Sequence, residues 1–225
     1  MNRLATSGEV ERIVRPSLDP PVVSADLVLR LQKYRDPGRV PPAVRRIAEA
    51  MATEATQLAA LEAVVWRGAV TAVDPVGEVT LDGRHRFRSR TLARLLDASA
   101  EALVFVLTVG AAIEARAQAL LEDKLYVEAV LLDTAAWAAI ELGKQGLRRQ
   151  LLDAERARGR SLTARLGPGH GDWAVEEQPA LLAVFGGAPV PVTVNESACM
   201  WPRKSISGVF GVVRRGGAGP GLTGP

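Results

Sequence analysis

The chain alternates between two apolar patterns, and each pattern predicts a different kind of element. In residues 43–61 the apolar positions recur at intervals of three and four, which marks one face of an amphipathic helix. Residues 102–110 form a continuous apolar run ending in glycine, which is typical of a buried strand. We expect further helices within 23–34 and over 90–97, 111–122, 124–158 and 174–186, and strands over 63–73, 78–81, 161–165, 191–194 and 205–213.

The predicted helix 124–158 is the most apolar of these elements. Only four residues of the stretch 127–142 are polar, so we expect this helix at the centre of the core. Asp133, Trp137 and Glu141 are spaced four apart and form a ridge along one flank. Because a carboxylate is costly to bury alone, each acidic side chain either pairs with a basic group or cap, or meets a cationic ligand.

The order of the elements is not a regular strand–helix–strand alternation. It predicts an α+β fold, with a twisted, mostly antiparallel sheet and helices packed against it. A length of 225 residues suits one domain, which we place at 21–213. We expect residues 1–20 to be a flexible lead-in and the Gly/Pro-rich residues 214–225 to be a disordered tail.

Composition excludes several classes of function. The net charge of +3 is too small to indicate a nucleic-acid-binding surface. No apolar stretch reaches the roughly 18 residues that span a bilayer, and the first residues lack the apolar segment of a signal peptide. We therefore expect a cytoplasmic protein that does not enter a membrane. The single cysteine, Cys199, excludes an intrachain disulfide.

Known cofactor motifs are missing or incomplete. His85 and His170 are the only histidines, and neither lies in the Asp-x-His-x-x-Gly motif of corrinoid-binding domains. No metal site is expected. No phosphate-binding P-loop occurs, and GPGHG at 167–171 lacks the surroundings of a dinucleotide fingerprint. Cys199 is interpreted as a packing residue rather than a nucleophile with His170 as its base.

Two segments combine strands with loops rich in glycine and proline, LTARLGPGHGDW at 162–173 and VTVNESACMWPRKSISGVFGVV at 192–213. Glycine lets a backbone approach a ligand closely, and such loops often carry binding residues. Arg165 lies where strand and loop meet. Its guanidinium suits bidentate recognition of a carboxylate, and a structural salt bridge is the alternative.

Both segments resemble parts of a known family. NESACMWPRKSISGVFG at 195–211 resembles the T-E-S-x-A-M-x-P-x-x-S-V-S-G run of the activation domain of cobalamin-dependent methionine synthase. RLGPGHGDW at 165–173 is similar to that family's R-P-A-P-G-Y loop, and 131–145 to the acidic helix before it. The short stand-alone relatives of this domain are the nearest in pattern.

The resemblance implies an S-adenosylmethionine-binding subunit without catalytic residues of its own. By motif, Arg165, Gly167, Gly169 and His170 would contact the ligand, and Glu141 would join them from the helix. Cobalamin would be held by a partner, the cobalamin-binding domain of a separate methionine synthase or corrinoid methyltransferase, and a flavodoxin-like protein would donate the electron. Any enzymatic role is accessory to reductive methylation of that cobalamin. The alternative is a docking module for a corrinoid protein that no longer binds S-adenosylmethionine.

Overall fold

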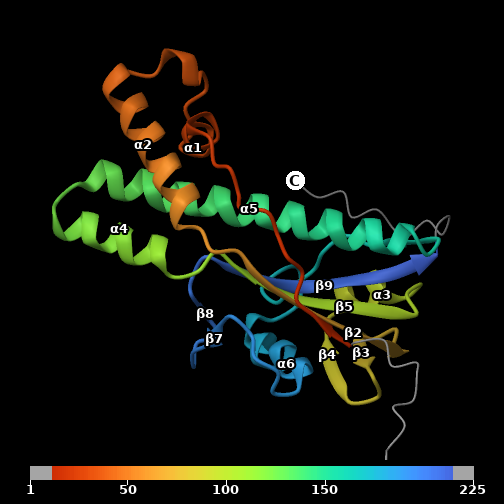
Figure 1. The fold of residues 1–225 in the computed structure, drawn as a ribbon. Helices are drawn as coiled ribbons and strands as arrows, with labels where there is room; N and C mark the ends of the chain where they lie inside the picture. Colours follow the sequence, from red (N-terminus) through yellow and green to blue (C-terminus); the bar gives the residue numbers. More distant parts are fainter. Residues whose placement is uncertain (1–11, 215–225) are drawn as a thin grey trace, which may run out of the picture.

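The computed structural model describes residues 12–214, so the first eleven residues of the expected lead-in and residues 215–225 of the expected tail lie outside it. The described residues form an α+β fold around a seven-stranded sheet with the order β4-β3-β2-β5-β9-β6, in which β1 also pairs with β2. Every neighbouring pair is antiparallel. The expected fold class is confirmed (Figure 1).

The strands of the sheet are β1 (Ile13–Val14), β2 (Glu62–Val73), β3 (Glu78–Leu81), β4 (His85–Arg88), β5 (Glu101–Thr108), β6 (Arg160–Leu162) and β9 (Ser205–Arg214). A separate two-stranded sheet joins β7 (Thr193–Val194) to β8 (Met200–Trp201). The α-helices are α1 (Ala25–Leu31), α2 (Pro42–Leu58), α3 (Arg90–Leu96), α4 (Ala112–Glu122), α5 (Tyr126–Arg156) and α6 (Gln178–Leu182). Short 3-10 helices are η1 (Pro37–Arg39), η2 (Val175–Glu177) and η3 (Ala183–Phe185).

The sheet is buried on both faces, which explains why its central strands are almost continuously apolar. Val65 and Phe105 point into one cluster with α1, α2, α4 and α5. Val64 and Val104, one position away on the same strands, point into a second cluster with α3, α6 and the chain from 166 to 192. Figure 1 shows α5 on one side of the sheet and α6 on the other. The two faces therefore have separate cores.

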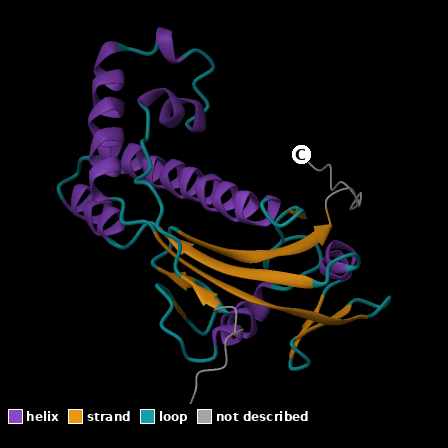
Figure 2. Ribbon diagram, turned by 45° about the vertical axis from the view of Figure 1, so that its right-hand side comes forward, coloured by secondary structure: helices purple, strands orange, loops and turns teal. Residues whose placement is uncertain are grey.

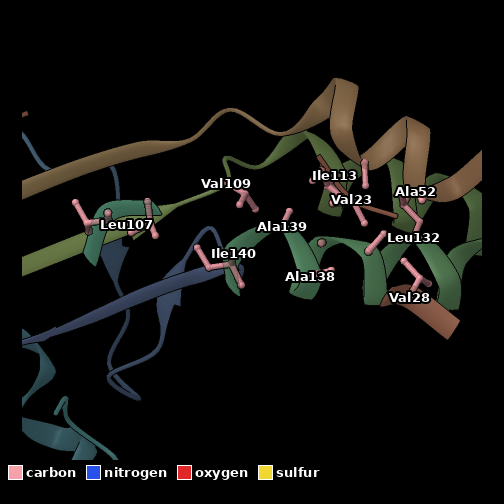
Figure 3. Close-up of a cluster of buried hydrophobic side chains, with 14 of the residues drawn as sticks. Val23, Val28, Ala52, Leu107, Val109, Ile113, Leu132, Ala138, Ala139 and Ile140 are labelled. Carbon is pink, nitrogen blue, oxygen red and sulfur yellow. The ribbon is translucent and has the colours of Figure 1, made fainter. Parts of the chain in front are cut away.

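Helix α5 lies at the centre of the first core, as its sequence predicts (Figures 2 and 3). Its small residues Ala138 and Ala139 are fully buried, so α5 packs closely on its neighbours. Gly143 permits the closest approach, because a Cβ there would lie 2.6 Å from Leu61 Cδ2. None of the helices between residues 12 and 214 is both long and apolar enough to cross a membrane.

Helix α3 starts where its sequence predicts, because Ser89 caps it. The Ser89 hydroxyl accepts a hydrogen bond from Leu92 N at 3.0 Å, satisfying one of the free amides of the first turn. Helix α1 is capped in the same way by Ser24, whose hydroxyl accepts from Leu27 N at 3.2 Å. Local capping thus fixes the first residue of both short helices.

Four parts of the fold differ from the sequence-based expectation. The segment 174–186, expected as one helix, is divided into η2, α6 and η3, because Pro179 has no N–H to continue a helix and Gly186 ends the segment at φ 61°. Strands β4 and β8 were not expected. Within the expected lead-in 1–20, residues Ile13 and Val14 form β1, because they pair with Trp66 and Val65 of β2.

Candidate functional site

The glycine-rich loop that follows β6 is fastened to β9 at its first residues. Leu166 N donates to Val209 O at 3.2 Å, and Val209 N donates back to Leu166 O at 2.7 Å. Leu166 packs into the core on the α3 side of the sheet. Arg165, one position earlier, lies near Glu141 of α5 on the opposite side. This bridge places the guanidinium of Arg165 between the loop, β9 and α5.

Arg165 is held in place without an ion pair. Its Nη1 donates to Ser207 O at 2.9 Å, and its Nη2 lies 3.2 Å from His170 Nε2. Nε2 can accept this bond only when the imidazole is neutral. Between residues 12 and 214, no carboxylate lies within ion-pair distance of Arg165. Burial lowers the pKa of Arg165, and the charge of Glu141 opposes that effect.

Two glycines make room for this arrangement. A Cβ on Gly208 would lie 2.6 Å from Leu166 O and 3.1 Å from Arg165 Cγ, and one on Gly167 would lie 2.8 Å from Ser207 O. Either side chain would push the loop away from β9. Gly167, one of the residues expected to contact a ligand, is buried, and it serves the close packing of the loop.

The loop also closes on itself through its backbone. His170 N donates to Gly167 O at 3.1 Å, and Gly169 N donates to Trp173 O at 2.8 Å. Gly169 has a φ of 84°, a conformation in which glycine is favoured, and it is exposed. Because its N–H is already used, the surface that Gly169 offers a ligand is its Cα and its carbonyl.

Asp172 anchors the far end of the loop to helix α3. Its carboxylate accepts hydrogen bonds from Ser89 Oγ at 2.7 Å, Arg90 N at 2.8 Å and Thr91 N at 3.0 Å. These donors, the Ser89 hydroxyl above all, hold the pKa of Asp172 well below its ordinary value. Asp172 is not among the site residues predicted from the sequence, although it directly follows the loop.

Trp173 adds an apolar anchor beside Asp172. Its side chain is buried, meets the Phe87 ring edge-on at a centroid distance of 5.6 Å, and donates from Nε1 to Glu177 Oε2 at 2.8 Å. Both ends of the loop are therefore fixed to the sheet or its helices. The sequence feature that could have indicated this anchoring is the pair Asp172-Trp173 directly after the glycines.

The ridge predicted along α5 exists, and Lys204 neutralises its first carboxylate. Lys204 Nζ lies 2.8 Å from Asp133 Oδ1 and 4.8 Å from the centroid of the Trp137 ring, a cation–π contact. The backbone N of Lys204 donates to Glu114 Oε1 at 2.7 Å. Of the two readings left open for Asp133, the structure shows the one in which it pairs with a basic group.

Glu141, the last residue of the ridge, is half-exposed and pairs with Lys144 one turn further along α5. It is also the acidic group whose charge raises the pKa of Arg165. The structure thus brings Arg165, Gly167 and His170 together directly, keeps Gly169 beside them in the loop, and places Glu141 nearby on α5. Whether these five residues bind a ligand remains a prediction.

Other candidate chemistry is not supported. Cys199 is exposed in a turn, where Asn195 Oδ1 accepts from Cys199 N at 2.9 Å, so its interpretation as a packing residue was wrong. Cys199 belongs to neither core, and its thiol donates to Ser197 O at 3.6 Å within the turn. Within residues 12–214 there is no group of three or more His, Cys, Asp or Glu residues suited to a metal ion.

Comparison with known proteins shows a likeness in structure but none in sequence. No protein-family model and no curated protein matches the sequence. A solved structure does match, the crystal structure of the MetH reactivation domain bound to AdoHcy, with a TM-score of 0.53 and 14% sequence identity over 82% of this chain. The fold is that of the methionine synthase reactivation domain. The match spans 65% of the neighbour's chain, and at this identity it establishes the fold alone.

Proposed function

We propose that this chain binds S-adenosylmethionine beside Arg165 and acts as an activation module for a cobalamin-dependent methyltransferase. The observation that carries the proposal is the guanidinium of Arg165, which is half-buried, held by Ser207 O and His170, and unpaired among the described residues. A cation positioned in this way suits an anionic ligand group. The fold supports the proposal, because its solved neighbour is bound to AdoHcy, a close analogue of the methyl donor.

The chemistry of S-adenosylmethionine fits the groups around the loop. Its carboxylate would accept from the free N–H groups of Arg165, since Nη1 and Nη2 each retain a donor beyond the bonds described above. Its ammonium and sulfonium charges would lie toward Glu141, the nearby half-exposed carboxylate. The exposed loop residues Gly169 and His170 would meet the adenosine. Each part of the ligand thus has a complementary group.

The proposed role requires partner proteins. S-adenosylmethionine supplies a methyl group, and this chain would orient it toward cobalamin on the cobalamin-binding domain of a separate methionine synthase or corrinoid methyltransferase. The sequence lacks the corrinoid motif, so cobalamin comes with the partner. A flavodoxin-like protein would supply the electron for reductive methylation in the cytoplasm.

The first test is calorimetric titration of the protein with S-adenosylmethionine. We expect micromolar binding, about −8 kcal/mol. Arg165→Ala should weaken it by roughly tenfold to a hundredfold, since a charge-assisted hydrogen bond contributes about 1.5–3 kcal/mol. The matched control is Arg148→Ala, which removes an exposed arginine from α5 and should leave the affinity unchanged. Equal affinity for the wild type and a folded Arg165→Ala variant would overturn the proposed site.

One observation favours the alternative, a docking module without S-adenosylmethionine. The backbone donors His170 N and Gly169 N are already bonded within the loop, and Gly167 is buried, so the loop offers few free N–H groups to adenosine. In that case millimolar S-adenosylmethionine would give neither heat nor thermal stabilisation. Binding to a purified corrinoid protein, measured without the methyl donor, would then support docking.

A further inference from the structure

A second candidate ligand site lies on the face of the sheet opposite α5. A cavity of about 430 Å³ that is open to solvent lies between the end of β2 and helix α3. Its apolar lining comes from Val73, Pro75, Ala93, Leu95 and Val213. Small-molecule sites in proteins occupy about 300–1,000 Å³ and combine an apolar lining with a few polar groups. The size and lining suit a small ligand with an apolar body.

Two arginines supply the polar groups of this cavity. Arg90 and Arg94 line it, are exposed, and lie one turn apart on α3, on the same side of the helix. Between residues 12 and 214, neither guanidinium lies within ion-pair distance of a carboxylate. Two unpaired guanidinium groups beside an apolar lining are suited to a carboxylate, phosphate or sulfonate group.

Nearby carboxylates form no ion pair with these arginines within residues 12–214. Asp74 lines the cavity, but its Oδ1 accepts from Val76 N at 2.5 Å within its own turn. Asp172 lies near the backbone of Arg90, where three donors from residues 89–91 already satisfy it. Asp97 lines the cavity at the opposite end of α3 from Arg90. The cavity is thus lined by Arg90 in the first turn of α3 and Arg94 in the last, together with two carboxylates that do not lie within ion-pair distance of either guanidinium.

The turn between β2 and β3 forms a fixed wall of this cavity. Ser89 N donates to Gly77 O at 2.8 Å, which ties the turn to the start of α3. Gly77 has a φ of 108°, and a Cβ there would lie 3.0 Å from Arg90 Cγ. The side-chain stem of Arg90 therefore packs against the turn, which holds the guanidinium beside the cavity.

We propose that this cavity binds a small organic anion, with its charged group on Arg90 and Arg94 and its apolar body on Val73, Ala93 and Val213. The cavity is distinct from the site at Arg165, because α3 packs on the opposite face of the sheet from α5, although Thr163 lines the cavity and Asp172 ties the loop to the backbone of Arg90. The proposal therefore does not depend on S-adenosylmethionine binding and can fail or succeed separately from it.

The test uses the full chain and the fluorescent anion anilinonaphthalene sulfonate. We expect saturable binding, weakened about tenfold by Arg90→Gln with Arg94→Gln, because two charge-assisted contacts are lost. The matched control, Arg84→Gln with Arg88→Gln, removes the same charge from exposed positions that do not line the cavity and should change the affinity less than about twofold, since screened surface charges act weakly at a distance.

Two further measurements locate the dye. Ala98→Trp replaces an exposed residue of the lining with a bulky side chain and should block both the anion and its uncharged analogue phenylnaphthylamine. S-adenosylmethionine should not displace the dye. The proposal is overturned if the wild type does not bind the dye, if Ala98→Trp binds it normally, or if the two double variants weaken binding equally. Circular dichroism melting of each variant checks that the fold is kept.

Discussion

Two of the acidic side chains on helix α5 have opposite surroundings. Glu155, near its C-terminal end, is 1% exposed and forms ion pairs with Arg67, Arg158 and Arg160. Glu141, four turns earlier, is half-exposed, and among residues 12–214 it pairs only with Lys144 on its own helix, although Arg165 lies near. One carboxylate is saturated by basic partners. The other lies near Arg165, a cation with no ion partner in the described part of the chain. This difference separates a structural network from a candidate site.

The Glu155 network joins α5 to the sheet. Arg67 of β2 and Arg160 of β6 also donate to Glu101 Oε2 of β5, at 2.9 Å and 2.8 Å. Two carboxylates and three arginines thus connect the helix to three strands. Asp172 is an intermediate case, since it is exposed yet accepts three hydrogen bonds. Glu155, Glu141 and Asp172 can be ranked by how far their removal lowers the free energy of unfolding or the affinity for the ligand.

The largest effect is expected for Glu155→Ala. Removing one partner of a buried ion pair leaves the others uncompensated, so we expect the free energy of unfolding to fall by about 3 kcal/mol. Urea denaturation followed by circular dichroism measures this. Asp153→Ala, which removes an exposed carboxylate from the same turn, is the control and should cost less than about 0.5 kcal/mol. Similar losses of unfolding free energy in the two variants would mean that the ion pairs of Glu155 do not stabilise the fold.

Glu141→Gln should affect binding rather than stability. Its pair with Lys144 is exposed and contributes less than about 0.5 kcal/mol to stability. If Glu141 faces the cationic part of S-adenosylmethionine, calorimetric affinity should fall about tenfold. Lys144→Gln breaks the same ion pair but keeps the carboxylate, so its affinity should not fall. Equal losses of affinity in both variants would show that binding depends on the ion pair between Glu141 and Lys144 and not on the carboxylate alone.

Asp172→Ala should give a smaller, pH-dependent loss of stability. The folded state lowers the pKa of Asp172, so its contribution is present above the ordinary carboxyl pKa of about 4 and is lost as the pH falls below it. At neutral pH we expect a cost of about 1 kcal/mol, as for loss of a helix cap. Urea denaturation of both proteins from pH 7 to pH 3 should show the difference shrinking. A constant difference would exclude the ionised carboxylate as its source.

Elements with local signals were predictable. Helix α5 follows from its apolar stretch, and α3 from the cap at Ser89. Strand β4 was missed because its four residues include two arginines, and it becomes a strand only by pairing with β3 and burying Phe87 against Trp173. The segment 174–186 looked helical in pattern, but its path depends on a distant contact, the hydrogen bond from Ser207 Oγ to Gln178 Oε1.

The contacts of the candidate site also divide into those with a local sequence signal and those without one. Arg165 and His170 lie five residues apart, so their proximity followed from the loop. Lys204 pairs with Asp133, and its backbone bonds Glu114, across large separations in the sequence, and no local pattern indicated either contact. A single sequence supplies residue types and spacing. It does not supply the register between β9 and its neighbours, which decides these contacts.

That register has a consequence for how the protein folds. Strand β9 lies between β5 and β6, and its pairing with β5 joins residue 108 to residue 205. Closing so long a loop is entropically costly, and folds rich in such distant pairings form slowly. Ser207, which holds Arg165, is on β9. Ser207 also pairs with Val106 of β5, so the strand that holds Arg165 reaches its final position only when these sequence-distant strands have met. The recovery of ligand binding during refolding would then report the completion of the sheet.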